Sequence, residues 1–535
     1  MPAVKGDYNE ILFPPPGKTA KDDTDAVMKF YKLPKAFPPA VLKEARELAR
    51  GGGGAFSSKG EIVLKRLDLR KKFIFTCDPM TARDYDDALS LETDRKGNRI
   101  LGVHIADVSH YVTPGSALDR EAYKRSTSVY LVDKVVPMLP EELSNGVCSL
   151  VPGEDRLTFT VFMTFDKNGE MVRRTFAKSV IRSQARFTYE QVMAILSGND
   201  RIAESANRRI GKKELKSIRA INELAQQLRA KRFAAGALDL EVAEPEVLLD
   251  ANGELESVVT RPYDESHQMI EECMVAANEA VAKELWTRGV KILARLHEAP
   301  DPEKLLMLRT ELRGLGVKMG NIENPKVFAQ FLKSIKKHPL YATIATMVLR
   351  SMKKAVYDGA AIGHFGLAKK YYAHFTSPIR RYPDLTLHRQ LTAFLASPSK
   401  AKISPKILAK WAEHTSEREQ LAAEAERGLL EIKKFRFLED QLNSRQILDY
   451  DAVISRVMPF GCFVEIPEIA TSGLVHVSLL SHRFLRYNES DCSLSAAGES
   501  YRAGDRMKVR IARVDFRERK LDFVPVRETR RYGRR

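Results

Sequence analysis

The chain has few cysteines, and none stands in a pattern that binds zinc or builds a disulfide framework. The five cysteines in 535 residues are far apart and form no CxxC pair. A disulfide-stapled fold and a cysteine-based zinc domain are therefore excluded. Isolated thiols are typical of proteins that stay in a reducing compartment. The five are Cys77, Cys148, Cys273, Cys462 and Cys492.

The sequence also lacks a long apolar run and an N-terminal targeting pattern. No stretch reaches the roughly 18 apolar residues that a membrane-spanning helix needs. The N-terminal segment MPAVKGDYNEILFPPPG does not place a basic region before an apolar one, as a signal peptide does. We therefore expect a cytoplasmic protein that does not bind membranes, and we expect a monomer.

Acidic residues are in deficit. The chain has 70 Asp and Glu against 87 Lys and Arg, a net charge of +17. This balance favours a polyanionic partner such as nucleic acid, although solubility alone is an alternative reason for it. Residues 501–535 contain 13 basic and 5 acidic residues and end in RETRRYGRR. That ending is typical either of an arm that binds phosphates or of a disordered, solubilising terminus.

A length of 535 residues exceeds one ordinary core, so we expect at least two domains. Strand patterns such as KKFIFTC and RLTFTVFMTF precede long amphipathic helices such as MIEECMVAANEAVAKEL. After Asn443, five short strands in about 85 residues predict a small closed barrel of the OB type. We predict an α+β protein with an N-terminal extension and helical linker (1–60, with Gly51–Gly54 as a linker), a mixed catalytic domain (61–442), an OB-fold barrel (443–526) and a basic tail (527–535).

Four aspartates crowd the segment FTCDPMTARDYDDALSLE: Asp78, Asp84, Asp86 and Asp87. Carboxylates this close repel one another, so we expect a cation to neutralise them. Asp oxygens suit Mg²⁺, which keeps waters and substrate phosphates as its other ligands. We predict that the four hold one or two Mg²⁺ ions, for which Mn²⁺ is expected to substitute. A set of exposed loop carboxylates is the alternative interpretation.

A calcium-binding EF-hand loop that starts at Asp84 is excluded. Its sixth position requires Gly and its twelfth requires Glu, but the sequence has Leu89 and Arg95 there. Two bound Mg²⁺ ions would instead suit phosphodiester hydrolysis, in which one ion activates water and the other stabilises the leaving oxygen.

A cationic partner for the phosphate is present in HFTSPIRRYPDLTLHRQL, residues 374–391. Pro378 is expected to place Arg380 and Arg381 at a turn or a helix start, where Arg380 can bind a phosphate bidentately. Asp384 and His388 share one helical face. Adjacent arginines on a solvated face are the alternative.

Taken together, these segments resemble the ribonuclease II / ribonuclease R family of exoribonucleases, whose catalytic domain is of the RNB type. The resemblance runs from about Glu61 to Val526. It rests on the motifs DPMTARDYDDA, HIADVSHYV, TSVYLVDKVVPMLPEELSNGVCSL, IEECMVAAN, ARLHEAP and HFGLAKKYYAHFTSPIRRYPDLTLHRQL. It implies Mg²⁺-dependent hydrolysis of single-stranded RNA from the 3′ end, with release of nucleoside 5′-monophosphates.

The resemblance also implies roles for single residues. Asp86 would be the aspartate whose loss is most damaging, and Arg380 would contact the phosphate. Tyr130 would stack on the 3′-terminal base. Further RNA contacts are expected from Tyr189, Glu271, Arg381 and Glu426.

The sequence departs from the family in two places. The stretch GALDLE at 236–241 has Leu238 and Leu240 where family members often carry a phenylalanine that sandwiches the base, so we expect a one-sided clamp. Only about 60 residues precede the catalytic domain, and none is typical of the cold-shock barrels that family members usually carry. We therefore expect the C-terminal barrel and tail to do most of the steering of RNA.

The barrel segment VISRVMPFGCFVEI followed by SGLVHVSLL resembles the OB-fold RNA-binding domain of the ribosomal S-one type. Phe460, Phe463 and His476 would lie on its RNA face, where bases stack on aromatic rings. The alternative is that one phenylalanine points into the core, since strand residues alternate between faces.

Two other functions stay open. A non-catalytic RNA-binding protein would keep the fold without the chemistry, and a deoxyribonuclease would share the chemistry but not the requirement for a 2′-hydroxyl. His104, Asp107 and His374 belong to the motifs, and we expect structural or supporting roles for them, because Mg²⁺ prefers oxygen ligands to imidazole.

Overall fold

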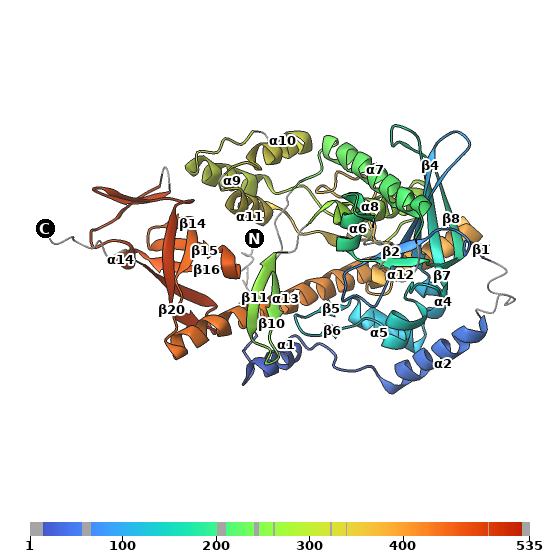
Figure 1. Cartoon of the computed structure of the whole chain (residues 1–535), viewed down its shortest axis with the longest axis horizontal. Helices are drawn as coiled ribbons and strands as arrows, with labels where there is room; N and C mark the ends of the chain where they lie inside the picture. Colours follow the sequence, from blue (N-terminus) through green and yellow to red (C-terminus); the bar gives the residue numbers. More distant parts are fainter. Residues whose placement is uncertain are drawn as a thin grey trace, which may run out of the picture.

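A seven-stranded mixed sheet forms the centre of the catalytic part (Figure 1). The computed structural model describes residues 14–55, 66–200, 210–239, 245–260, 263–320, 324–338, 340–489 and 492–526. The predicted tail 527–535, Leu240 and most of the segment 61–69 lie outside these residues. The strand order is β1-β8-β7-β4-β3-β2-β9. The strands are β1 (Leu67–Asp68), β2 (Phe75–Cys77), β3 (Asp87–Thr93), β4 (Arg99–Ala106), β7 (Asp155–Phe165), β8 (Met171–Arg182) and β9 (Ala185–Phe187).

The predicted hairpin between ALSLE and RILGVHIADVSHYV is confirmed as β3 and β4, with Gly97 at φ +80° in its turn. The second strand is shorter than expected, because the chain turns into helix α4 (Val108–Tyr111) after Asp107. Asp107 is fully buried and accepts hydrogen bonds from Arg66 and Lys178, which holds the chain at that point. This cluster does not line the cavity described below, in keeping with a structural role.

Helices cover both faces of the sheet. On one face lie α6 (Tyr189–Leu196), α7 (Lys212–Ala234) and α8 (Glu265–Thr287). On the other lie α4, α5 (Ala117–Arg125) and α2 (Pro39–Ala55). Helix α12 (Tyr382–Ala396) contributes residues to both cores. Helix α2 extends through Gly51–Gly54, which we had predicted to be a linker; glycine has a low helix propensity but does not prevent a helix.

Three further helices pack around a core of their own, namely α9 (Pro302–Gly314), α10 (Pro325–Ile335) and α11 (Tyr341–Ser351). Leu238, where we noted the missing phenylalanine, packs against this core. Three small strand pairs complete the catalytic part: β5 (Val129–Tyr130) with β6 (Val135–Val136), β10 (Pro245–Leu249) with β11 (Leu255–Thr260), and β12 (Ala294–Leu296) with β13 (Val356–Asp358).

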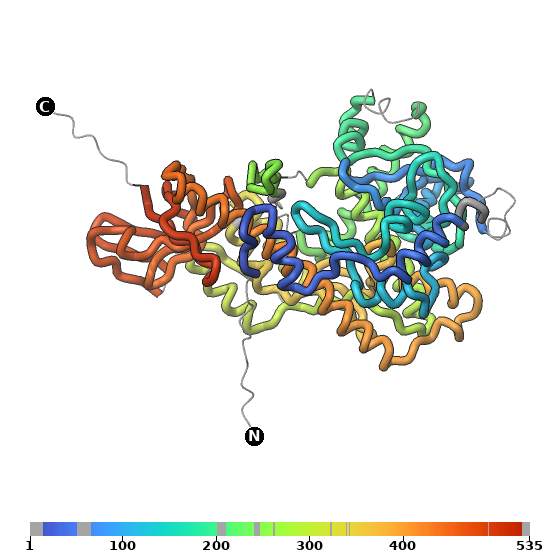
Figure 2. The backbone as a smooth tube through the Cα atoms, turned by 90° about the horizontal axis from the view of Figure 1, so that it is seen from below, coloured from blue at the N-terminus to red at the C-terminus, as the bar shows by residue number. Residues whose placement is uncertain are grey.

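The 40-residue helix α13 (Pro405–Ser444) connects the catalytic part to the C-terminal barrel (Figures 1 and 2). Helix α1 (Asp23–Phe30) lies against it, held by the buried Asp23, which pairs with Lys433 and Arg436. The far end of α13 carries Phe435 and Leu438 into the core of the barrel. The catalytic part and the barrel therefore share one continuous helix.

The five predicted barrel strands are confirmed as a closed barrel in the order β14-β15-β16-β21-β20. They are β14 (Tyr450–Met458), β15 (Gly461–Ile466), β16 (Thr471–His476), β20 (Arg506–Asp515) and β21 (Lys520–Pro525). Helix α14 (Val477–Leu480) and a three-stranded sheet of β17 (Arg486–Asn488), β18 (Ser493–Ala496) and β19 (Glu499–Tyr501) stand between β16 and β20. None of the described helices is both long and apolar enough to cross a membrane.

Candidate active site

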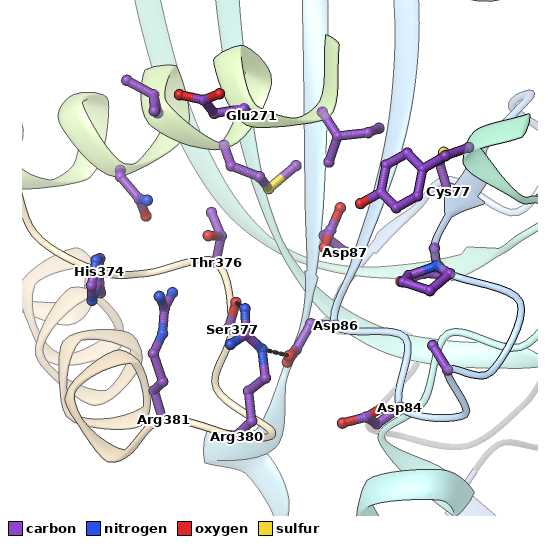
Figure 3. A pocket seen from close by; sticks show the side chains of 18 of the residues that line it. Cys77, Asp84, Asp86, Asp87, Glu271, His374, Thr376, Ser377, Arg380 and Arg381 are labelled. Atoms are coloured by element: carbon purple, nitrogen blue, oxygen red, sulfur yellow. Dashed lines mark hydrogen bonds and ion pairs between the residues drawn. The ribbon is translucent and has the colours of Figure 1, made fainter. Parts of the chain in front are cut away.

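The four aspartates line one cavity of about 460 Å³ at the end of strands β2 and β3. Figure 3 shows Asp84, Asp86 and Asp87 in it. Asp78 directly follows β2, and Asp87 begins β3. These two strands pair through Phe75 and Leu89, so the two carboxylates approach the cavity from neighbouring strands. Asp84 and Asp86 lie in the irregular segment between the strands. The sequence expectation that two adjacent segments bring the four together is confirmed.

A positive charge in the cavity would stabilise the ionised form of its carboxylates. Burial raises the pKa of Asp86 well above its ordinary value, and the cation of Arg380 offsets only part of this effect. Burial and then the charge of Asp87 raise the pKa of Asp78 to about 8, and burial raises the pKa of Asp87 to about 6. Asp78 Oδ2 is buried and has no hydrogen-bond partner. A divalent cation would satisfy this oxygen and offset the repulsion.

The carboxylates do not form a ready-made metal centre. Among the described residues, no group of three or more His, Cys, Asp or Glu side chains is arranged to hold an ion. Asp86 is instead turned toward Arg380 (Figure 3), and Tyr130 Oη donates to Asp84 at 3.4 Å. The donor set still fits Mg²⁺, which needs only one or two carboxylates besides water and substrate phosphate.

The loop before α12 brings Arg380 to the carboxylates. The backbone N–H of Ile379 donates to Asp86 Oδ1 at 2.9 Å, and Arg380 Nε lies 3.6 Å from Asp86 Oδ2. Arg380 also donates from Nη2 to Ser377 Oγ at 3.0 Å. Its side chain is 42% exposed, so it can reach a ligand in the cavity. The predicted helix start is confirmed, with Arg381 at the N-cap of α12.

We predict a contact with RNA for Arg381, but in the structure this side chain pairs with a buried carboxylate. It lines the cavity, but its Nη2 donates to Asp384 Oδ1 at 2.8 Å and its side chain is only 16% exposed. Asp384 is fully buried and also accepts the backbone N–H of Ser377 at 2.8 Å. The pair thus fixes both ends of the loop that carries Arg380.

Tyr130 stands at the mouth of the cavity with 41% of its surface exposed. Its backbone N–H donates to Glu426 Oε1 on α13 at 2.8 Å. Two residues earlier, the N–H of Ser128 donates to the carbonyl of Arg380. Tyr130, the expected stacking residue, and Arg380, the expected phosphate contact, are therefore linked through the hydrogen bond between Ser128 and Arg380. Glu426 supports Tyr130 from beside the cavity and does not line it.

Tyr189 and Glu271 line the cavity from the α6 and α8 side. The ring of Tyr189 stacks on His267 at 3.9 Å between centroids, so one face of it is already covered. Glu271 lies 3.0 Å from Arg232 and accepts a hydrogen bond from Tyr263. Both residues are in position to meet a nucleotide, but each also has a protein partner.

The barrel residues lie apart from this cavity. Phe463 stands between the buried Cys462 and Val464 and so faces outward, and Phe460 is 45% exposed. Their rings meet edge to face at 6.1 Å, and His476 is exposed at the register position opposite Gly461. Neither phenylalanine points into the barrel, so the core alternative is wrong for both.

The remaining motif residues have structural partners. His104 is buried between Ser90 and Thr160, which hold its two ring nitrogens. His374 lines the cavity, bonded through Nδ1 to Tyr357 Oη, and burial lowers its pKa well below the usual value. Burial raises the pKa of Cys77, so this thiol stays protonated.

Sequence reasoning missed the residues that hold the site together. Asp384 was noted only as sharing a face with His388, and Ser377 and the N–H of Ile379 were not considered. The only signal for Asp384 was its place three residues after Arg381, in the first turn of a helix, where an acid is favourable.

Comparisons with known proteins cover both parts of the chain. The model of the RNB domain matches residues 66–397, and that of the S1 RNA binding domain matches residues 449–524. Ribonuclease R of Thermotoga maritima is 42% identical over 518 residues, which are 95% of this chain and 71% of that protein. Ribonuclease R of Escherichia coli is 36% identical over 513 residues, 93% of this chain and 61% of that protein.

Comparisons with solved structures also find ribonuclease R. The apo form of Mycoplasma genitalium ribonuclease R superposes with a TM-score of 0.84 at 28% identity, over 95% of this chain and 78% of that one. Structures of that enzyme also exist with ribose methylated single-stranded RNA and with double-stranded RNA. A yeast pseudonuclease, Ssd1, shares the fold at 22% identity, with a TM-score of 0.67 over 81% of this chain and 53% of that one. The RNB match over more than half of the sequence and the relatives along most of it lead to one conclusion: the chain belongs to the RNB family of ribonucleases and is a hydrolytic exoribonuclease.

Proposed function

We propose that this enzyme degrades single-stranded RNA from the 3′ end, releases nucleoside 5′-monophosphates and requires Mg²⁺, with two ions in the complete site. The observation that carries the proposal is the cavity in which Asp86 and Arg380 face each other beside three more carboxylates. A phosphodiester is the group that needs both features, a cation-binding acid cluster and a guanidinium, within one small space.

Asp86 and Arg380 have different roles in the proposed reaction. Asp86 is held in place by the N–H of Ile379, so its second oxygen is directed into the cavity. Arg380 is the cation that binds the phosphate and stabilises the charge that grows on it in the transition state. Bound Mg²⁺ supplies Lewis-acid stabilisation and the activation of water for attack.

The shape of the site supports a threaded single strand. Tyr130 presents an exposed ring at the mouth, where a base of the strand can stack on it. The far side of the cavity is closed by buried residues, with Tyr372 6% and Asn278 3% exposed. A cavity closed on this side suits a chain end, in keeping with the exonucleolytic activity of the family.

RNA also has a second contact surface on the barrel. The exposed Phe460 and His476 and the half-buried Phe463 form an aromatic patch, and stacking there tolerates any base sequence. We infer that this patch holds the strand while its 3′ end occupies the cavity.

The different-class alternative is an RNA-binding protein without catalysis, since a pseudonuclease shares the fold. The presence of Asp78, Asp84, Asp86, Asp87 and Arg380 around one cavity favours the enzyme. A protein that only binds RNA would have no use for four carboxylates around one cavity, because carboxylates repel phosphate.

The test uses an oligo(A) labelled at every nucleotide, with and without Mg²⁺, and compares the wild type with Asp86→Asn. We expect stepwise shortening and release of 5′-AMP by the wild type, complete loss of both with EDTA, and binding without cleavage by Asp86→Asn. Cleavage by Asp86→Asn at the wild-type rate would contradict the assigned role. A single deoxynucleotide near the 3′ end should slow the step that meets it, and an unchanged rate would instead favour a deoxyribonuclease.

A further inference from the structure

A second cavity lies behind the active site. It has a volume of about 400 Å³ and is lined by residues that include Ala235, His297, His364, Phe365 and Lys369. None of its lining residues lines the first cavity. Both cavities fall within the roughly 300–1,000 Å³ that small-molecule sites occupy. No part of the proposed reaction uses the second one.

The two cavities are separated by a thin wall. Tyr372 lines the active-site cavity and His364 lines the second, and their ring centroids are only 5.3 Å apart, edge to face. One hydrogen bond holds the Tyr372 hydroxyl, from Asn278 Nδ2 at 3.3 Å. This distance is at the long end for an N–H···O bond, so the hydrogen bond restrains the Tyr372 ring only weakly.

An enzyme that holds a threaded RNA strand in its active site gains from a second opening through which the product can leave. The argument rests on the proposed function, in which the strand enters past Tyr130 and its last nucleotide lies against the buried side of the cavity. After each cleavage the remaining strand still occupies the side of Tyr130 by which it entered. An opening on the Tyr372 side would let the released nucleotide leave while the strand stays in place.

We propose that the second cavity is the exit route for the nucleoside 5′-monophosphate product, with the Tyr372–His364 pair as its gate. The lining suits this ligand. His297 and His364 stack at 4.9 Å between centroids and offer flat ring surfaces to a base. Lys369, which lines the cavity and pairs with Glu279 at 2.6 Å, provides a cation for the phosphate. A route of this kind lets the strand advance by one nucleotide without withdrawing.

The experiment fills the exit with a bulky side chain. Ala235 is an exposed residue at the end of α7 that lines the second cavity, so Ala235→Trp should obstruct it without disturbing a core. Its neighbour Ala234 is also exposed but lines neither cavity, so Ala234→Trp is the matched control. Ile362→Trp, on another part of the lining, is a second obstructing variant. Rapid quenching of a 5′-labelled oligo(A), mixed with enzyme and started with Mg²⁺, separates the first cleavage from the later ones.

We expect both obstructing variants to cut the first bond at the wild-type rate and to be slowed about tenfold in every later step, because product release then limits turnover. Ala234→Trp should match the wild type in all steps, and a normal first cleavage also shows that each variant is folded. The proposal is overturned if no step is slowed. It is equally overturned if the first step is slowed as much as the later ones, because the cavity would then lie on the path by which RNA enters. The wild-type lanes test the proposed function separately, since they must show stepwise shortening of the 5′-labelled strand from its 3′ end before the variants are compared.

Discussion

Asp384 gives the sharpest test of how the site is held together. This carboxylate is fully buried in the first turn of α12, and its Oδ1 accepts from Ser377 N and from Arg381 Nη2, both at 2.8 Å. The loop that it anchors donates the Ile379 N–H to Asp86 and carries Arg380. Replacement by asparagine preserves the shape and one acceptor oxygen, but it removes the charge that faces Arg381.

The size of the effect can be estimated in two parts. Breaking a buried ion pair by neutralising one partner costs about 3–5 kcal/mol of stability, and the retained hydrogen bonds place this case at the lower end. Loss of one hydrogen bond to a charged group costs about 1.5–3 kcal/mol. If the Ile379–Asp86 contact is lost in the transition state, kcat should therefore fall about 10- to 100-fold. The KM for long RNA should stay close to the wild-type value, because the barrel is untouched.

Asp119→Asn is the matched control. Asp119 is also buried, accepts a hydrogen bond from the Tyr382 hydroxyl at 3.0 Å and pairs with Arg389 at 2.8 Å, so like Asp384 it is a buried acid held by an arginine and one further donor. It does not contact the loop 377–381. Urea unfolding should show similar losses of stability for the two variants, whereas the fall in kcat should be confined to Asp384→Asn. If Asp119→Asn lowers kcat by the same factor, the loop is not positioned by Asp384 and the reasoning is wrong.

Three further predictions concern other parts of the site. Tyr130→Ala should weaken the hold on the last nucleotides and lengthen the final fragment on a sequencing gel; unchanged fragments would count against stacking. Phe460→Ala combined with Phe463→Ala should weaken binding of long RNA by about 1–3 kcal/mol per lost stack and leave short substrates unaffected, as measured by filter binding; equal losses on both would refute a separate barrel contact. Since the pKa of Asp78 is raised to about 8 and that of Asp87 to about 6, the metal-free protein holds these protons and loses stability as pH rises from about 4 toward 8. Mg²⁺ should release the protons and cancel this loss, and calorimetry in buffers of different ionisation enthalpy should detect the release; Mg²⁺ binding without proton release would contradict the shifts.

The sequence predicted the parts of the molecule that depend on local pattern. Alternating strand residues and a tight turn were enough to place β3 and β4, and five short strands were enough for the barrel. The crowding of Asp78, Asp84, Asp86 and Asp87 indicated one site, because charges so close in the chain must share a neighbourhood. These features require no knowledge of what folds against them.

Long-range contacts could not be predicted in this way. Nothing near Glu426 in the sequence indicates that it accepts the N–H of Tyr130, 296 residues earlier in the chain. Arg381 has the same chemistry as Arg380, yet only the three-dimensional position of Asp384 makes one of them a structural partner and leaves the other exposed. The position of Asp86 likewise depends on the backbone N–H of Ile379, 293 positions later in the chain.

Helix α13 has a consequence for how substrate length is sensed. One stiff rod carries both Glu426, which braces the mouth of the cavity, and Phe435, on which the barrel is seated nine positions further along. A helix rises about 1.5 Å per residue, so these two points are kept about 14 Å apart along the axis. Helix α13 therefore keeps a fixed distance between the cavity and the barrel. On the proposed path, in which RNA contacts both the barrel and the cavity, a shortening RNA loses its contact with the barrel at one fixed number of remaining nucleotides.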